Sequence, residues 1–184
     1  MIEVEAKAKI NNINEIKLNL GNLNAKKIKT EYQEDIYFNS PVVDFAETDE
    51  ALRIRKTETK NEKKIFITYK GPKIDKKSKT RKEIEIEIEN ETKCKDIFEN
   101  LKFKTVRTVK KYREYYNINE FTISIDKVDG LEPYMEIETM VEDDSNYDKK
   151  VEEVFELFNN LGIKDNFERN SYLELLENKD SNQN

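Results

Sequence analysis

The chain has 184 residues and a formal net charge of −6, and 39% of its residues are charged against 36% that are hydrophobic. This length suits one domain with a sizeable core, and the acidic balance argues against a surface that coats nucleic acid or an anionic membrane. One cysteine and no histidine exclude an internal disulfide, a structural zinc site and any mechanism that needs a histidine.

Eight segments alternate polar and apolar residues with the two-residue period of a β-strand. In the first, residues 2–9, Glu3, Glu5 and Lys7 share one face. In the strongest, residues 80–89, glutamates alternate with isoleucines. The other predicted strands cover residues 30–39, 51–56, 64–70, 109–116, 121–126 and 134–138.

Further segments repeat apolar residues at the spacing of an α-helix. The predicted helices begin near Ile13, Cys94, Val151 and Tyr172. Thr92 is the expected N-cap of the second helix. Residues 178–184 are polar and predict a disordered tail, so we expect a single domain over residues 1–177.

The charges on these strands are segregated by sign. One strand carries Arg53 and Arg55, whereas another carries Glu136 and Glu138. An open antiparallel sheet with a solvated charged face is the simpler alternative, but such a face tends to mix the signs so that neighbouring strands pair. We therefore predict an α+β fold. It is a closed antiparallel eight-stranded β-barrel with its ionic face around a wet tunnel and its aliphatic face covered by helices packed outside.

A tunnel with a basic wall and an acidic wall suits a definite kind of ligand. Clustered arginine and lysine bind the oxygens of an oligophosphate, and arginine does so bidentately. Carboxylates bind Mg²⁺ or Mn²⁺, hard ions that also bridge to phosphates. The sequence therefore predicts an oligophosphate site with a divalent metal ion.

Several ordered blocks of the sequence resemble the CYTH superfamily, the triphosphate tunnel enzymes. Its signature is an N-terminal ExExK strand, which here is Glu3-Val-Glu5-Ala-Lys7. The form of the central blocks is most similar to the branch that includes class IV adenylyl cyclases. The remaining blocks are QEDIYFNSP, DEALRIRK, TYKGPK, SKTRKEIEIE, VKKYREYY, ISIDKVDGLEPYMEIE and RNSYLELL.

The resemblance implies roles for individual residues. The implied triphosphate ligands are Lys7, Arg53, Arg55, Lys70, Arg81, Lys111, Arg113 and Arg169. The implied ligands of one or two Mg²⁺ or Mn²⁺ ions are Glu3, Glu5, Glu85, Glu87, Asp126, Glu136 and Glu138. Tyr37 and Lys70 match a Tyr–Lys pair with which some hydrolytic members activate water, so they are the candidate catalytic residues. Glu132 replaces the second glycine of the family's Gly-Leu-Gly turn.

Three functions follow as expectations. The first is an adenylyl cyclase that converts ATP into cyclic AMP and pyrophosphate with a divalent metal. The second is a triphosphatase that hydrolyses tripolyphosphate, thiamine triphosphate or a nucleoside triphosphate, because the same walls serve both reactions. The third is a polyphosphate-binding module without turnover.

The expected partner is accordingly a small-molecule triphosphate. We expect no nucleic acid and no membrane as partner, and a monomer or a homodimer. The sequence has no signal peptide and no apolar run of about 18 residues, so we expect a cytoplasmic protein.

Overall fold

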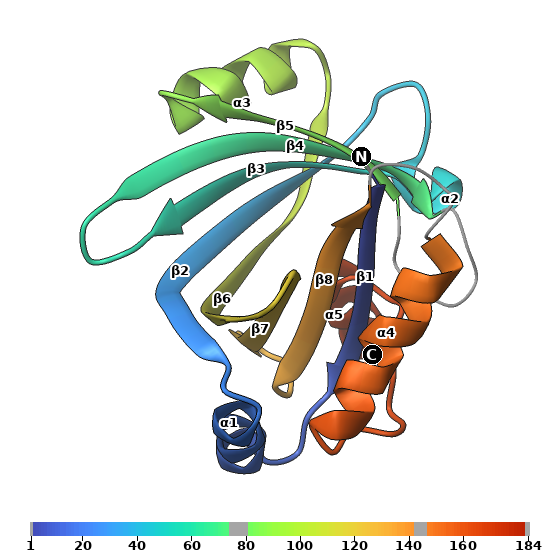
Figure 1. Cartoon of the computed structure of the whole chain (residues 1–184). Helices are drawn as coiled ribbons and strands as arrows, with labels where there is room; N and C mark the ends of the chain where they lie inside the picture. The colour runs from blue at the N-terminus through green and yellow to red at the C-terminus, as the bar shows by residue number, and fades with distance from the viewer. Residues whose placement is uncertain (1, 74–80, 142–146, 183–184) are drawn as a thin grey trace.

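The eight predicted strands form one closed antiparallel barrel in the order β1-β5-β4-β3-β2-β6-β7-β8 (Figure 1). This is a computed structural model, and it describes residues 2–73, 81–141 and 147–182. The strands are β1 (Ile2–Lys9), β2 (Lys26–Asn39), β3 (Ala51–Glu58), β4 (Lys63–Lys73), β5 (Arg81–Ile88), β6 (Lys104–Ile118), β7 (Phe121–Val128) and β8 (Tyr134–Val141). The predicted fold class is confirmed.

The helices are α1 (Ile13–Asn22), α2 (Phe45–Thr48), α3 (Glu91–Asn100), α4 (Tyr147–Asn160) and α5 (Tyr172–Ser181). The predicted N-cap of α3 was wrong, because the side chain of Asn90 accepts the hydrogen bond from the Lys93 amide. The short helix α2 was not predicted. Its four residues are too few to show a helical period. Among the described residues, no helix has the length and apolar character needed to cross a membrane.

The predicted tail was wrong over residues 178–181, which continue helix α5. Two polar contacts hold this last turn to the barrel. Lys179 donates a hydrogen bond to the carbonyl of Gly130 at 2.6 Å, and Asp180 forms an ion pair with Arg107 at 2.5 Å. Residues 183–184 lie outside the described residues.

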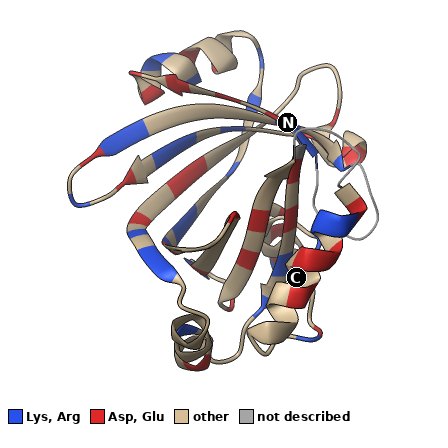
Figure 2. Cartoon of the chain, in the orientation of Figure 1, with Lys and Arg blue, Asp and Glu red and all other residues tan. Residues whose placement is uncertain are grey.

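The two faces of the first strand show how the barrel is built. Glu5 and Lys7 project inward and are buried, while Val4, Ala6 and Ala8 belong to an apolar core on the other face. That core fills the space between the outer surface of the barrel and the helices α1 and α4, and α4 runs along the outside of β1 (Figure 1). The predicted ionic interior therefore holds for this strand, and Figure 2 shows the acidic bands of β1 and β8 side by side.

Helices cover the outer face only in part, which corrects the expectation of a complete cover. Helix α3 packs Cys94 and Phe98 against outward residues of β2 and β3. On β5, however, Ile84 is 52% exposed and Ile86 is 56% exposed. Helix α3 packs with Ile88 at the end of β5, so the part of this outer face that stays exposed lies earlier in the strand.

The C-terminal segment covers part of one end of the barrel. Tyr172 and Leu176 of α5 pack among inward residues of the barrel, including Val109 and Val128. Just before α5, the amide of Glu168 donates a hydrogen bond to the Lys7 carbonyl at 2.8 Å. The segment thus lies along the edge of β1, which pairs with β5 at a single described position, Glu3 with Arg81. The interior is therefore a pocket that α5 narrows at this end.

Candidate active site

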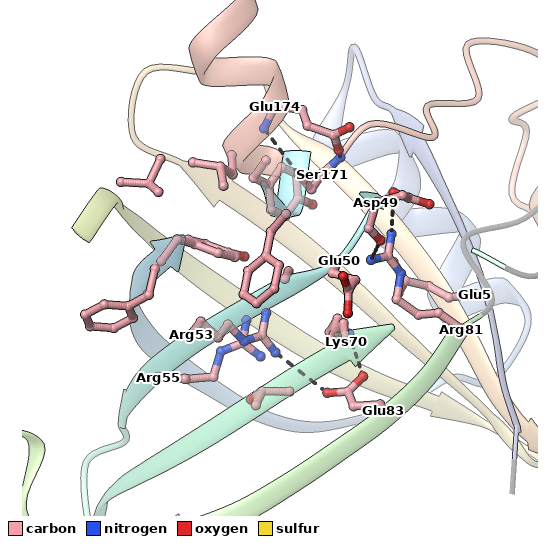
Figure 3. A pocket seen from close by; sticks show the side chains of 18 of the residues that line it. Glu5, Asp49, Glu50, Arg53, Arg55, Lys70, Arg81, Glu83, Ser171 and Glu174 are labelled. Atoms are coloured by element: carbon pink, nitrogen blue, oxygen red, sulfur yellow. Dashed lines mark hydrogen bonds and ion pairs between the residues drawn. The ribbon is translucent and has the colours of Figure 1, made fainter. Parts of the chain in front are cut away.

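The barrel encloses a cavity of about 540 Å³, within the range of about 300–1,000 Å³ that is typical of sites for small organic ligands. Inward side chains of the strands line its deeper part, and residues of α2 and α5 line its mouth. Figure 3 shows Arg53, Arg55 and Lys70 projecting into it below α5.

Most of the predicted site residues meet in this cavity. Those that line it are Glu3, Glu5, Tyr37, Arg53, Arg55, Lys70, Arg81, Glu85, Lys111, Arg113, Glu136 and Glu138. They share inward positions on different strands, so the closed barrel brings together residues that are far apart in the sequence. Glu132 is exposed, and β8 still presents Glu136 and Glu138 to the cavity despite the missing glycine.

Four predicted residues do not line the cavity: Lys7, Glu87, Asp126 and Arg169. Glu87 and Arg169 are exposed to solvent. Glu87 lies one inward position beyond Glu85, on the part of β5 that extends past the cavity. Sequence alternation gives the face of a residue but not the point along the strand where the cavity ends, so it did not separate these glutamates.

Lys7 lies beneath the C-terminal segment. Its ammonium group donates a hydrogen bond to the Asn170 carbonyl and lies 4.1 Å from the centre of the Tyr172 ring and 5.3 Å from that of Tyr134. The two rings and the carbonyl compensate the charge of this buried lysine. In this structure Lys7 contacts the C-terminal segment, and it does not line the cavity.

Asp126 is fully buried and binds protein groups. The guanidinium of Arg113 donates to both of its carboxylate oxygens, with Nε at 2.6 Å from Oδ1, and also to Glu136. The Tyr172 hydroxyl donates to Asp126 Oδ2 at 2.6 Å. Despite burial, the two carboxylates raise the pKa of Arg113 well above its usual value. Arg113 is therefore neutralised by groups of the protein.

Asp35 is a site residue to which the sequence analysis assigned no role. It lies on β2 directly opposite Arg55, and its Oδ1 and Oδ2 accept from Arg55 Nε at 2.6 Å and Nη2 at 2.7 Å. Arg53 Nη1 lies 3.6 Å from Asp35 Oδ2. Despite full burial, Arg55 and Arg53 hold the pKa of Asp35 well below its usual range. The sequence could have indicated Asp35 as a site residue, because the alternation of β2 places it on the inward face between Gln33 and Tyr37.

Near the mouth, Lys70 lies much closer to one carboxylate than to another. Its Nζ lies 2.6 Å from Glu83 and 3.7 Å from Glu3. Lys70 and Arg53 therefore lower the pKa of Glu83 against the effect of burial. Burial raises the pKa of Glu3 to about 8, and the neighbouring Glu5 and Glu83 act in the same direction. Glu3 thus tends to carry a proton at neutral pH.

Glu5 and Glu138 face each other on β1 and β8 and complete an acidic wall with Glu3. Burial, together with Glu5 and Glu136, raises the pKa of Glu138 to about 7. Among the described residues, no three acidic side chains already converge as a metal site. Mg²⁺ usually takes one or two protein carboxylates and completes its shell with water and substrate phosphates. The carboxylates of the acidic wall fit such an ion, and the buried Oε2 of Glu3 has no hydrogen-bond partner among the described residues.

Lys111 projects into the cavity from β6 and is buried. Burial and the neighbouring Arg113 lower the pKa of its ammonium group to about 7, although Asp126 at 3.8 Å opposes the effect. An anion bound beside Lys111 would favour the charged form. Lys111 therefore has an environment suited to a phosphate group.

The CYTH domain family model matches residues 1–172 of the chain. The chain belongs to the CYTH domain family. A Methanocaldococcus jannaschii protein that is provisionally named an adenylate cyclase is 49% identical, over 95% of this chain and 98% of its own. A solved structure from Pyrococcus horikoshii is 44% identical, with a TM-score of 0.90 over 96% of this chain and 99% of its own.

A more distant CYTH-like structure comes from Hippeastrum. It is 19% identical and has a TM-score of 0.69 over 96% of both chains, so it shows the shared fold alone. That protein is described as an adenylyl cyclase candidate with a dominant triphosphatase activity.

The mouth of the CYTH cavity mixes apolar and acidic side chains, which the sequence analysis did not predict. Its apolar members are Phe38, Phe45, Val106 and Leu173, from β2, α2, β6 and α5. Its acidic members include Asp44, Glu50, Glu174 and Glu177. The cavity is therefore charged throughout, and apolar side chains are available only at its opening.

Tyr37 and Lys70 both line the CYTH cavity, and strand β3 lies between their strands. Tyr37 is opposite Arg53, whereas Lys70 is opposite Ala51, one inward position closer to the mouth. A ligand that spans the cavity can reach both side chains, since they line the same space.

Proposed function

We propose that this CYTH domain is a divalent-metal-dependent enzyme that converts ATP into cyclic AMP and pyrophosphate. The observation that carries this proposal is that the basic side chains lie in the depth of the cavity, whereas its mouth offers an apolar part formed by Phe38, Phe45, Val106 and Leu173 among acidic residues. A triphosphate fits the charged part, and the nucleoside attached to it fits the apolar part. Inorganic tripolyphosphate would leave the apolar part unused.

The basic residues of the cavity would bind the phosphate oxygens. Arg53, Lys70 and Lys111 project into it from β3, β4 and β6, so they surround a bound chain on several sides. Phosphoryl transfer depends mainly on positioning and on neutralising charge. These side chains would stabilise the negative charge that develops on the leaving pyrophosphate.

The acidic wall would hold Mg²⁺ or Mn²⁺ through Glu3, Glu5 and Glu138. When bound, the ion would neutralise phosphate charge and help to orient the chain. The proton that Glu3 carries at neutral pH would have to leave first, because a ligand carboxylate is ionised.

Cyclisation requires the ribose 3′-hydroxyl to lie in line with the α-phosphorus. The 3′-oxygen forms a bond to that phosphorus, the bond to the β-phosphate oxygen breaks, and the hydroxyl proton is lost. Holding both ends of one molecule favours this intramolecular attack. The 49% identical relative, provisionally named an adenylate cyclase, supports this reaction.

Hydrolysis of the same triphosphate is the second candidate. Tyr37 and Lys70, which match the pair that activates water in some hydrolytic members, line the same cavity. In this reaction water attacks the terminal phosphorus, the bond from that phosphorus to its bridging oxygen breaks, and the diphosphate leaves while orthophosphate is formed. The two reactions differ in which phosphorus is aligned.

The test is a product analysis with Mg²⁺ or Mn²⁺, with ATP and tripolyphosphate offered in parallel. Cyclic AMP with an equal amount of pyrophosphate supports the cyclase, and orthophosphate without cyclic AMP supports the triphosphatase. The Glu3→Ala/Glu5→Ala variant should be inactive, whereas Glu58→Ala/Glu62→Ala removes two exposed carboxylates from the β3–β4 turn and should be active. Tight phosphate binding without turnover would instead support the third expected function, a polyphosphate-binding module.

A further inference from the structure

Two arginines, Arg53 and Arg55, occupy successive inward positions of β3, and both line the cavity. Figure 3 shows their guanidinium groups side by side. Arg53 is buried, the Arg55 side chain is 12% exposed, and both are positively charged, so residue type and spacing do not distinguish them. Their contacts make them different.

Arg55 is bound by Asp35. The two side chains form a bidentate pair at 2.6 and 2.7 Å, the geometry in which an arginine and a carboxylate interact most strongly. Asp35 is 2% exposed and lies directly across the β2–β3 ladder, so water does not compete for it. A phosphate that approached Arg55 would meet a guanidinium already neutralised by Asp35.

Arg53 has no comparable partner among the described residues. Its two ion-pair contacts are long, 3.6 Å to Asp35 and 3.9 Å to Glu83, and its buried Nε has no hydrogen-bond partner. Burying such a donor unpaired is costly unless a ligand satisfies it. The Arg53 guanidinium therefore has the unfilled hydrogen-bonding capacity that an anion requires.

We propose that Arg53 is the arginine of β3 that binds a phosphate group, and that Arg55 is a positioning residue that occupies Asp35 and keeps this carboxylate from pairing with Arg53. This inference rests on the proposed function, because it concerns how that site binds its triphosphate. The opposite wall follows the same rule, since Arg113 is held by Asp126 and Glu136.

The consequence is a specific pattern of suppression between variants. Arg55→Gln releases Asp35, which then pairs with Arg53 and competes with phosphate. Adding Asp35→Asn removes the competitor and leaves Arg53 free again. If Arg55 instead contacted phosphate directly, the second substitution would not restore what the first one removed.

The experiment measures the binding of inorganic tripolyphosphate by calorimetry, with EDTA present so that turnover does not interfere. We expect Arg53→Gln to weaken binding at least about tenfold, in line with the loss of charge-assisted hydrogen bonds. Arg55→Gln should weaken binding by a similar factor. Arg55→Gln/Asp35→Asn should bind within about threefold of the native protein, whereas Arg53→Gln/Asp35→Asn should stay weak.

Thermal unfolding of each variant accompanies the titrations, because Arg55→Gln leaves a buried carboxylate without its main partner. If that single variant does not fold, the comparison of Arg55→Gln/Asp35→Asn with Arg53→Gln decides. A folded double variant that binds as weakly as Arg53→Gln overturns the inference. Native protein that neither binds tripolyphosphate nor turns over ATP contradicts the proposed function itself.

Discussion

The ammonium group of Lys7 lies 4.1 Å from the centre of the Tyr172 ring, which joins the first strand to the last helix. The same tyrosine donates its hydroxyl hydrogen to Asp126 at 2.6 Å. One aromatic side chain thus covers a buried cation and binds a buried anion, and it also lines the cavity.

The first prediction concerns this hydroxyl. Tyr172→Phe keeps the ring over Lys7 but leaves Asp126 without one donor. We expect the free energy of unfolding to fall by about 1.5 to 3 kcal/mol, the range for hydrogen bonds to charged groups. Urea unfolding measures it. The control Tyr112→Phe alters a tyrosine that is 57% exposed and should change stability by less than about 0.5 kcal/mol. Equal effects of the two substitutions would contradict the role of Tyr172.

The second prediction concerns pH and stability without metal. The pKa of Glu3 is raised from 4.5 to about 8, and that of Glu138 from 4.5 to about 7. Raised carboxyl pKa values give stability that is present below pH 4.5 and is lost as pH rises toward the folded-state value. Between pH 5 and 7 the free energy of unfolding should therefore fall.

The matching variant is Glu3→Gln/Glu138→Gln, which removes both titrating groups. Its free energy of unfolding should depend less on pH between 5 and 7 than that of the native protein. Lys111, with a pKa lowered to about 7, gives the opposite slope only above that pH, so it does not obscure this window. If the free energy of unfolding of the variant fell with pH as steeply as that of the native protein, groups other than Glu3 and Glu138 would be the ones that titrate.

The third prediction concerns metal binding. Because Glu3 carries a proton at neutral pH, binding of Mn²⁺ to the acidic wall should release protons and should tighten between pH 6 and 8. Calorimetry at one pH in buffers of different ionisation enthalpy counts the released protons. Glu3→Gln should release fewer. Metal binding that is independent of pH and of this substitution would argue against the acidic wall as the site.

The fourth prediction separates the mouth of the cavity from its depth. Phe45→Ala removes an aromatic side chain from the mouth of the cavity. We expect the KM for ATP to rise about tenfold, and the affinity for tripolyphosphate to change by less than about twofold, because only ATP carries an organic group. Val42→Ala, at a side chain that is 85% exposed in the same loop, is the control. If Phe45→Ala weakened the binding of ATP and of tripolyphosphate equally, the mouth would have no role in recognising the nucleoside.

The local sequence pattern determined where the strands lie and which face of each strand is charged. The alternation of Glu83, Glu85 and Glu87 with Ile84 and Ile86 predicts a strand with one ionic face, because successive side chains of a strand point to opposite sides. The segregation of arginines from glutamates then favoured a closed barrel with that face inward. Both conclusions need only residue type and spacing, so they could be drawn before the structure.

Which ionic residues reach a ligand was decided by the tertiary structure. Asp35 becomes the partner of Arg55 because β2 and β3 pair in that register, and Lys7 is withdrawn because the C-terminal segment packs over it. The sequence by itself determined the fold, the charged interior and the residues that face it. Only the closed barrel decided which of these charges neutralise one another and which face the cavity, because ion pairing depends on distances across strands that no local pattern contains.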